Sequence, residues 1–522
     1  MNHRIILNID IISATGPFLE RVLDSGTVTE EALYPFVDQY IDLPNGAPTG
    51  LMAIAFNTFC QFESIESRCM STFAEVCDRY DAAGKSIDLI EHYYKPFVRL
   101  YREYGIDPWD VFIRRCRTRG YESWVSVRMN DAHDNDYEEF LMDTFAYRAK
   151  WKDHAIGDRY GYYWKCLDYA HDEVRERFLG YIEEQLDRYD MDALELDFMR
   201  EIWCFDYMNN PDCCAIMTQF MRDVRARVTA AEAVRGHKIR LSVRLPREIE
   251  QCRVWGFDVA AWDAESLVDH ITVTPRWSSS DSDMPIEEWV RRFPHIEIAA
   301  GVETLLRFDD LRTPEGDAVN LDAAAVNGLA AAYYAQGAAQ INLYNYFCCP
   351  PMRGKNTAPK TLHPVYDRTV QILTHCSDEE TVRAYPRRHM VMYQDIVPEG
   401  YQPYKPLPIT VENGAAASVR VPTGPIPDGK RVLLILTFAQ GGPDTTSVEV
   451  NGTSCTGFVP YDTDSLIETA EGRLVILGNA CFPKGCSMWA CEICPDGASE
   501  VQTVSFRSDH AVINHVEIRI GD

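Results

Sequence analysis

Eight short apolar runs rich in β-branched residues recur between residues 5 and 347, and most of the segments between them have helical periodicity or helix punctuation. Runs of this length that alternate with helices are typical of βα units. Eight such units in about 350 residues match the size of a TIM barrel. We therefore predict an α/β fold in which residues 1–347 form a (β/α)8 barrel. The predicted strands are residues 5–10, 52–59, 122–130, 193–199, 239–245, 270–275, 296–303 and 340–346.

Two of the intervening segments carry clear helix signals. Residues 172–188 place their apolar side chains on one helical face and begin with two acidic residues, which the helix dipole favours. Residues 322–336 begin with Asp322, a suitable N-cap, and stop at Gly337. A doubly wound open sheet is the competing arrangement, but its first strand would precede a Gly-rich phosphate turn. Here Asp10 is followed by Ile-Ile-Ser-Ala-Thr-Gly, which favours the barrel.

The pattern changes after residue 347. Residues 348–408 are irregular and Pro-rich, which predicts an extension and linker. From residue 409 to 522, short strands alternate with turn signals such as Asn451-Gly452, which predicts an antiparallel β-sandwich. The join lacks the Gly/Ser composition of a flexible tether, so we expect this domain to pack against the barrel.

Composition argues against several classes of partner. A net charge of −28 over 522 residues repels phosphate backbones and anionic lipids, so we expect neither nucleic acid nor membrane as the main partner. The first residues lack a long apolar region and a cleavage site, and the 17 cysteines are scattered. Both features favour reduced thiols and a cytoplasmic location. No cofactor is expected, and homo-oligomer formation is left open.

Catalytic groups in TIM barrels lie at the C-terminal ends of the strands. In the fourth run, Ala193-Leu-Glu-Leu-Asp-Phe-Met, the two-residue strand period places Glu195 and Asp197 on one face. Asp197, at the strand end, is the best catalytic candidate, and the alternative is that it only orients a neighbouring arginine. Glu195 lies one step deeper and is better explained by a structural ion pair.

Two further carboxylates are catalytic candidates. Glu303 ends the seventh run, and Gly301 just before it would allow a ligand to approach closely. Glu201 lies in the loop after the fourth run, where it is either an acid or simply exposed. We predict that Asp197 and Glu303 form the catalytic pair across the barrel, with Glu201 as the third candidate.

The third run ends in Arg128, Asn130, Asp131 and His133, a set that suits recognition of sugar hydroxyls. A metal site is the rival interpretation, although the pattern offers only one histidine there. Three arginines lie near the ends of predicted strands, namely Arg128, Arg244 and Arg276. They suggest a substrate with an acidic group or many vicinal hydroxyls. If protein carboxylates occupy all three, the acidic-substrate hypothesis fails. The other predicted substrate-binding residues are Asn8, Asp10, Asn57, Arg244, Arg276, Trp277, Tyr344 and Asn345.

Two stretches also resemble a known group of proteins. Residues 124–134 and 194–200 are similar to the bacterial proteins labelled family 10-like glycosyl hydrolases, a resemblance that covers roughly residues 1–347. It implies a barrel and carbohydrate chemistry without a defined substrate. More distantly, residues 192–197 resemble the fourth strand of alpha-amylase-type barrels, which implies a nucleophile role for Asp197, although that pattern has Arg where Glu195 stands. In another clan of barrel glycosidases the acid follows strand four and the nucleophile ends strand seven, which implies Glu201 or Asp197 with Glu303.

The preferred function is hydrolysis of a glycosidic bond by two carboxyl groups. One alternative is a lyase or isomerase acting on a sugar or sugar acid, with His133 or Asp131 as the base and a divalent metal. Another is a barrel that binds carbohydrate without turnover. In the tail, Cys481, Cys486, Cys491 and Cys494 include one CxxC pair, but the strand pattern explains these thiols as core residues better than as zinc ligands.

Overall fold

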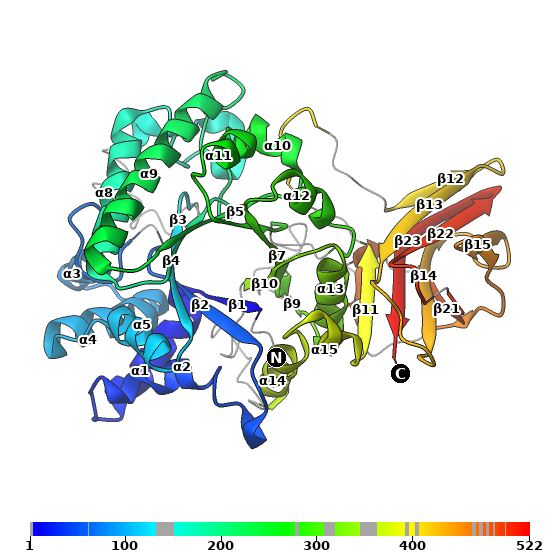
Figure 1. Ribbon diagram of the computed structural model, residues 1–522, viewed down its shortest axis with the longest axis horizontal. Helices are drawn as coiled ribbons and strands as arrows, with labels where there is room; N and C mark the ends of the chain where they lie inside the picture. The colour runs from blue at the N-terminus through cyan, green and yellow to red at the C-terminus, as the bar shows by residue number, and fades with distance from the viewer. Residues whose placement is uncertain are drawn as a thin grey trace.

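The computed structural model contains the predicted closed barrel of eight parallel strands (Figure 1). It describes residues 4–60, 62–131, 151–276, 281–306, 319–344, 363–391, 396–401, 407–461, 466–468, 473–476, 480–483, 486–495 and 497–521. The barrel strands are β1 (Ile5–Ile9), β2 (Leu51–Asn57), β3 (Glu122–Arg128), β4 (Ala193–Asp197), β5 (Arg240–Leu245), β6 (His270–Val273), β7 (Glu297–Glu303) and β10 (Gln340–Tyr344). They follow one another around the barrel in the order β1-β10-β7-β6-β5-β4-β3-β2, and β4 and β7 are three strands apart by the shorter route. The TIM-barrel prediction is confirmed.

Helices surround the barrel (Figure 1). They are α1 (Gly16–Asp24), α2 (Pro35–Asp38), α3 (Phe73–Ala82), α4 (Lys95–Tyr104), α5 (Pro108–Thr118), α8 (Asp172–Arg188), α9 (Cys213–Arg235), α10 (Ile249–Val254), α11 (Val259–Ala264), α12 (Ile286–Arg292) and α13 (Ala323–Ala335). Short helical turns lie at η1 (Ile11–Thr15), η2 (Glu31–Leu33), η3 (Pro44–Gly46), η4 (Ile90–Tyr94), η6 (Lys152–His154) and η7 (Asp158–Tyr163), and two short strands, β8 (Leu305–Leu306) and β9 (Val319–Asn320), pair beyond β7. Both helix predictions are confirmed, since α8 spans the predicted residues and Asp322 caps α13 by accepting the Ala325 N–H at 2.6 Å.

The barrel interior changes from apolar to polar along the strands. One buried cluster contains Ile6, Ala53, Ala55, Trp124, Ala193 and Ala299. Further along β4, the inward positions are Glu195 and Asp197, both almost completely buried. A much larger apolar core lies between the barrel wall and the helices. The outer core stabilises the barrel, and its polar interior leads toward the C-terminal strand ends, which we call the barrel mouth.

The C-terminal region is built from antiparallel sheets, as predicted. Its main sheet has the order β11-β23-β14-β21-β17, with β12 paired to β23, and a second sheet has the order β13-β22-β15-β16. A three-stranded sheet, β18-β19-β20, is also present. The two larger sheets share a separate apolar core. The strands are β11 (Arg387–Val391), β12 (Ile409–Glu412), β13 (Ala416–Pro422), β14 (Val432–Gln440), β15 (Thr446–Val450), β16 (Thr453–Ser454), β17 (Val459–Pro460), β18 (Leu466–Glu468), β19 (Arg473–Ile476), β20 (Ala480–Pro483), β21 (Ser487–Glu492), β22 (Val501–Ser508) and β23 (His510–Ile520).

The prediction that residues 348–408 form only an irregular linker is wrong for the part that the structure describes. This part contains helices α14 (His363–His375) and α15 (Glu379–Arg383), followed by strand β11. Strand β11 pairs with β23 of the C-terminal sheet and lies against α13 of the barrel (Figure 1). The approach is close, because a Cβ atom on Gly328 of α13 would lie 1.9 Å from the backbone oxygen of Arg388.

A buried ion-pair network joins the two domains at β11. Arg388 contacts Glu517 of β23 at 2.8 Å and Asp322, the N-cap of α13, at 2.5 Å. The Arg388 and Glu517 side chains are 4% and 0% exposed, so this charge pair lies in the interface itself. The expected packing of the C-terminal domain against the barrel is confirmed.

Two global features concern the cysteines and the helices. Among the described residues, the cysteines whose thiol environment is given are free, and most of them are buried. Among the described residues, no helix combines the length and apolar character needed to cross a membrane.

Candidate active site

Asp197 lies at the end of β4 between two arginines on the neighbouring strands. The strand register places Arg128 of β3 and Arg244 of β5 on either side of it. Its Oδ1 accepts the backbone N–H groups of Met199 and Arg200 at 2.9 and 3.0 Å, and its Oδ2 lies 2.8 Å from Arg244 Nη1. Burial alone would lower the pKa of Arg244, but the Asp197 charge beside it raises that pKa. The carboxylate is thus fixed in position and faces a charged guanidinium.

Glu195 lies one layer below Asp197 in a hydrogen-bonded polar layer. It accepts the Ser126 hydroxyl at 2.8 Å and the Asn8 amide at 3.4 Å. Burial raises the pKa of Glu195 to about 7, although the nearby Arg244 charge opposes this rise. The expected structural role fits this environment, but through hydrogen bonds to neutral groups rather than through a direct ion pair.

Glu201, in the loop after β4, is completely buried and is paired with Arg276. Burial raises the pKa of Glu201 to about 7, and the Arg276 charge limits the rise. Its Oε1 has no hydrogen-bond partner among the described residues. A carboxyl group in this environment can carry a proton near neutral pH, which a general acid requires. The interpretation of Glu201 as a merely exposed loop residue is wrong.

Glu303 ends β7, with its side chain buried, and pairs in register with Tyr344 of β10. The Arg244 guanidinium lies 3.7 Å from the centre of the Tyr344 ring, a cation–π contact. Burial raises the pKa of Tyr344, and the Asp197 charge adds to this effect.

Gly301 does not leave room for a ligand as expected, because a Cβ there would lie 2.3 Å from Thr274.

The three predicted arginines are all paired with protein carboxylates. Arg128 contacts Asp10 at 2.5 Å and Asp131 at 3.0 Å. Arg244 pairs with Asp197, and Arg276 pairs with Glu201. Each guanidinium therefore already faces a protein carboxylate, which argues against the expectation that these arginines select an acidic substrate.

The predicted asparagines differ in their surroundings. Asn130 donates to the carbonyls of Leu167 and Trp203 and accepts the Leu167 N–H, so it holds two loops together. Asn57 donates to the Ser126 carbonyl at 3.1 Å, and its Oδ1 is buried without a partner among the described residues. Asn8 faces Glu195, as described above. His133, Trp277 and Asn345 lie outside the described residues.

An aromatic pair beside Arg276 was not predicted as part of the site. Tyr163, from the loop after β3, stacks on Trp203, from the loop after β4, with ring centres 3.5 Å apart. The Arg276 guanidinium lies 5.4 Å from the Tyr163 ring centre. The aromatic composition of residues 160–164, Tyr-Gly-Tyr-Tyr-Trp, is the sequence signal that could have indicated this platform. Aromatic faces next to carboxyl groups suit contact with the apolar faces of sugar rings.

The mouth therefore combines three buried carboxyl groups in different electrostatic environments. Asp197 is paired with an arginine and with two backbone N–H groups, and Glu201 has a pKa near neutrality. Glu303 enters from β7, which is separated from β4 by β5 and β6 on one side and by four strands on the other. Such a set can supply a carboxylate and a carboxylic acid at the same pH.

Comparison with known proteins assigns no family to this chain. No protein-family model matches the sequence, and no curated protein matches it. Among solved structures, a chitinase from Paenibacillus sp. FPU-7 aligns over 99% of this chain at 9% identity and a TM-score of 0.40. This chain spans 54% of that chitinase chain. A family 18 chitinase from Chromobacterium violaceum (98% of this chain, 89% of that one, 9% identity, TM-score 0.38) and a maltogenic alpha-amylase from Thermotoga neapolitana (99% of each chain, 10% identity, TM-score 0.35) also align.

Proposed function

We propose that this protein is a glycoside hydrolase that cleaves an oligosaccharide or glycoside at the barrel mouth. The observation that carries the proposal is the contrast between Asp197, the last residue of β4, and Glu201, in the loop that follows β4. Asp197 faces Arg244 as a carboxylate, whereas burial raises the pKa of Glu201 to about 7. Carboxyl groups whose environments differ in this way are the basis of acid and base assignments in glycosidases.

In this proposal Asp197 is the nucleophile or the base. Its Oδ1 is held by two backbone N–H groups, so the carboxylate has a defined orientation toward the mouth. Two groups compete for the acid role. Glu303 is favoured by its place on a strand nearly opposite β4, and Glu201 is favoured by its pKa. Carboxyl groups about 5–5.5 Å apart would support retaining chemistry, and about 6.5–9.5 Å would support inverting chemistry.

Glu201→Gln and Glu303→Gln, assayed on two kinds of glycoside, identify the acid. Loss of the acid should reduce cleavage of substrates with poor leaving groups by about 100-fold or more, because the departing oxygen is no longer protonated. Cleavage of aryl glycosides with good leaving groups should largely survive. If Glu201 is the acid, wild-type turnover should also fall as pH rises through about 7, and this fall should disappear in Glu201→Gln.

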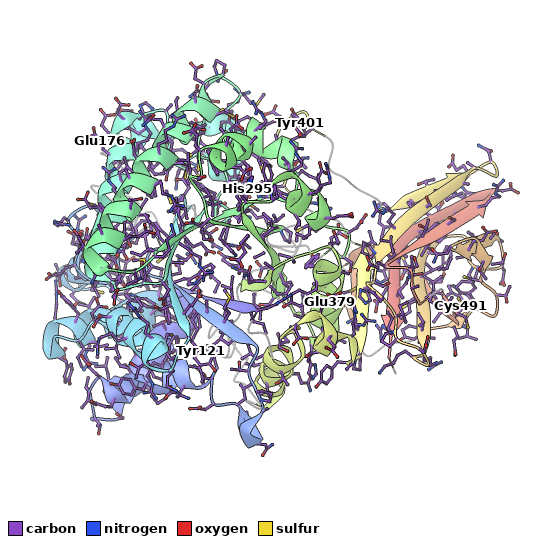
Figure 2. The ribbon with its side chains drawn as sticks, viewed as in Figure 1. Tyr121, Glu176, His295, Glu379, Tyr401 and Cys491 are labelled. Carbon is purple, nitrogen blue, oxygen red and sulfur yellow. The ribbon has the colours of Figure 1, made fainter. Side chains whose placement is uncertain are left out.

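The matched control is Glu176→Gln on the exposed surface of α8, labelled in Figure 2. This variant should behave as wild type on both substrates. If neither Glu201→Gln nor Glu303→Gln distinguishes good from poor leaving groups, acid catalysis by these residues is ruled out.

A further inference from the structure

We propose that His154, His171 and Glu173 bind a divalent metal ion of the Zn²⁺ type. One ligand atom from each of these side chains lies within 4.8 Å of the others. The His154 Nε2 atom is 3.8 Å from a Glu173 carboxylate oxygen, and the two imidazole rings have centres 4.6 Å apart. Two imidazoles and one carboxylate are a recurring ligand set for Zn²⁺ and related ions. This site shares no residue with the carboxyl groups of the barrel mouth.

The backbone around the cluster fixes the histidines relative to each other. Ala155 and Leu167 form an antiparallel bridge, and Asp168 donates its N–H to the His154 carbonyl at 2.7 Å. The Asp168 carbonyl in turn accepts the His171 N–H at 3.2 Å. His154 and His171 therefore project from one hydrogen-bonded ribbon. Binding does not require two independent loops to come together.

The remaining ligand comes from the first turn of α8. His171 is the N-cap residue of that helix, and Glu173 follows in its first turn. The positive end of the helix dipole disfavours a cation, but the Glu173 charge and the neighbouring Asp172 oppose that effect. The Asp172 carboxylate is paired with Arg175, so it does not compete as a ligand.

To bind the ion, the three ligand atoms need to move only slightly closer together. Ligand distances of about 2.0–2.2 Å in a tetrahedral site place the ligand atoms roughly 3.4 Å apart. The Glu173 side chain is 65% exposed, and its carboxylate already lies 3.8 Å from His154 Nε2. Three protein ligands leave one position for water. The ion would fasten the loop after β3 to the start of α8.

The test is zinc content and affinity of the full chain. The protein is stripped with a chelator, incubated with Zn²⁺ alone and passed through a desalting column, and bound zinc is then measured by mass spectrometry. We expect one zinc per chain in the wild type, and a loss of affinity of about 100-fold or more in His154→Asn and His171→Asn. Co²⁺ should give a visible absorption spectrum in the wild type that these variants lack.

The matched control is His295→Asn, because His295 is 82% exposed, lies outside the cluster and is labelled in Figure 2. It should bind zinc as the wild type does. Glu173→Gln provides a second variant at an exposed position where unfolding is not expected, and it should also bind more weakly. Because every variant keeps all the cysteines, zinc held by thiols would appear equally in each. No zinc in the wild type, or equal zinc in the wild type and the three cluster variants, would overturn the proposal.

Discussion

Asp197→Asn is expected to reduce glycoside turnover by about 1,000-fold or more while substrate binding largely survives. Asparagine keeps the shape of the side chain and can still accept the backbone N–H groups of Met199 and Arg200 through its oxygen. It removes the negative charge that would attack or stabilise the reacting sugar carbon. Turnover is measured by release of reducing sugar and binding by calorimetry, both on the same substrate.

The ion pair with Arg244 makes a structural control necessary. In Asp197→Asn the buried Arg244 loses its carboxylate partner, which also destabilises the fold. Arg244→Gln breaks the same pair but leaves the Asp197 carboxylate in place. Thermal unfolding should show a loss of stability in both variants. If Arg244→Gln loses turnover as completely as Asp197→Asn, the role of Asp197 is to pair with the arginine and not to react.

Glu517→Gln is expected to lower the free energy of unfolding by about 3–5 kcal/mol, because it leaves Arg388 without its main partner in a buried interface. Asp322, the other carboxylate that contacts Arg388, is half-exposed and cannot replace the lost charge of Glu517. Chemical denaturation measures the change. Glu492→Gln on the exposed surface of β21 is the control, since its partner Arg431 is also exposed. A change below about 1 kcal/mol, as in an exposed pair, would contradict the buried-pair explanation.

The same pair predicts a dependence of stability on pH. Burial alone would raise the pKa of Glu517, but Arg388 holds it well below the usual value of 4.5. A carboxyl group with a lowered pKa in the folded state contributes stability above its unfolded pKa and loses that contribution as the pH falls. Wild-type stability should therefore begin to fall below about pH 4.5, and the Glu517→Gln variant should lack this component of the fall.

The barrel was predictable because its signals are local. Alternation of short apolar runs with helical segments is set by burial on each element, and α8 and α13 begin where acidic first-turn and N-cap residues predicted. Strand β11 was missed for the opposite reason. Its sequence, Arg-Arg-His-Met-Val, is typical of a solvated segment. In the structure Arg388 is buried because it pairs with Glu517, and a partner 129 residues away in the sequence leaves no local pattern that could predict it.

In the candidate site, the positions of residues at strand ends were predictable from the sequence, whereas the contacts between their side chains were not. Strand periodicity placed Asp197 inward at the mouth, and the buried position of Glu303 agrees with its strand-end prediction. Periodicity could not show that Asp197 and Arg244 pair across two strands, because that depends on register and side-chain direction. The Tyr163–Trp203 stack joins two separate loops, so its assembly depends on tertiary structure.

A crystal structure of the Asp197→Asn variant soaked with a mixture of monosaccharides tests the central claim most directly, since it locates the reacting carbon. The account predicts a sugar at the barrel mouth, with its anomeric carbon about 3–3.5 Å from the side chain of residue 197. The anomeric hydroxyl oxygen, which stands where the glycosidic oxygen of a substrate would be, should lie within reach of Glu201 or Glu303. A sugar bound elsewhere, or a mouth that stays free of sugar at saturating concentrations, would contradict the account.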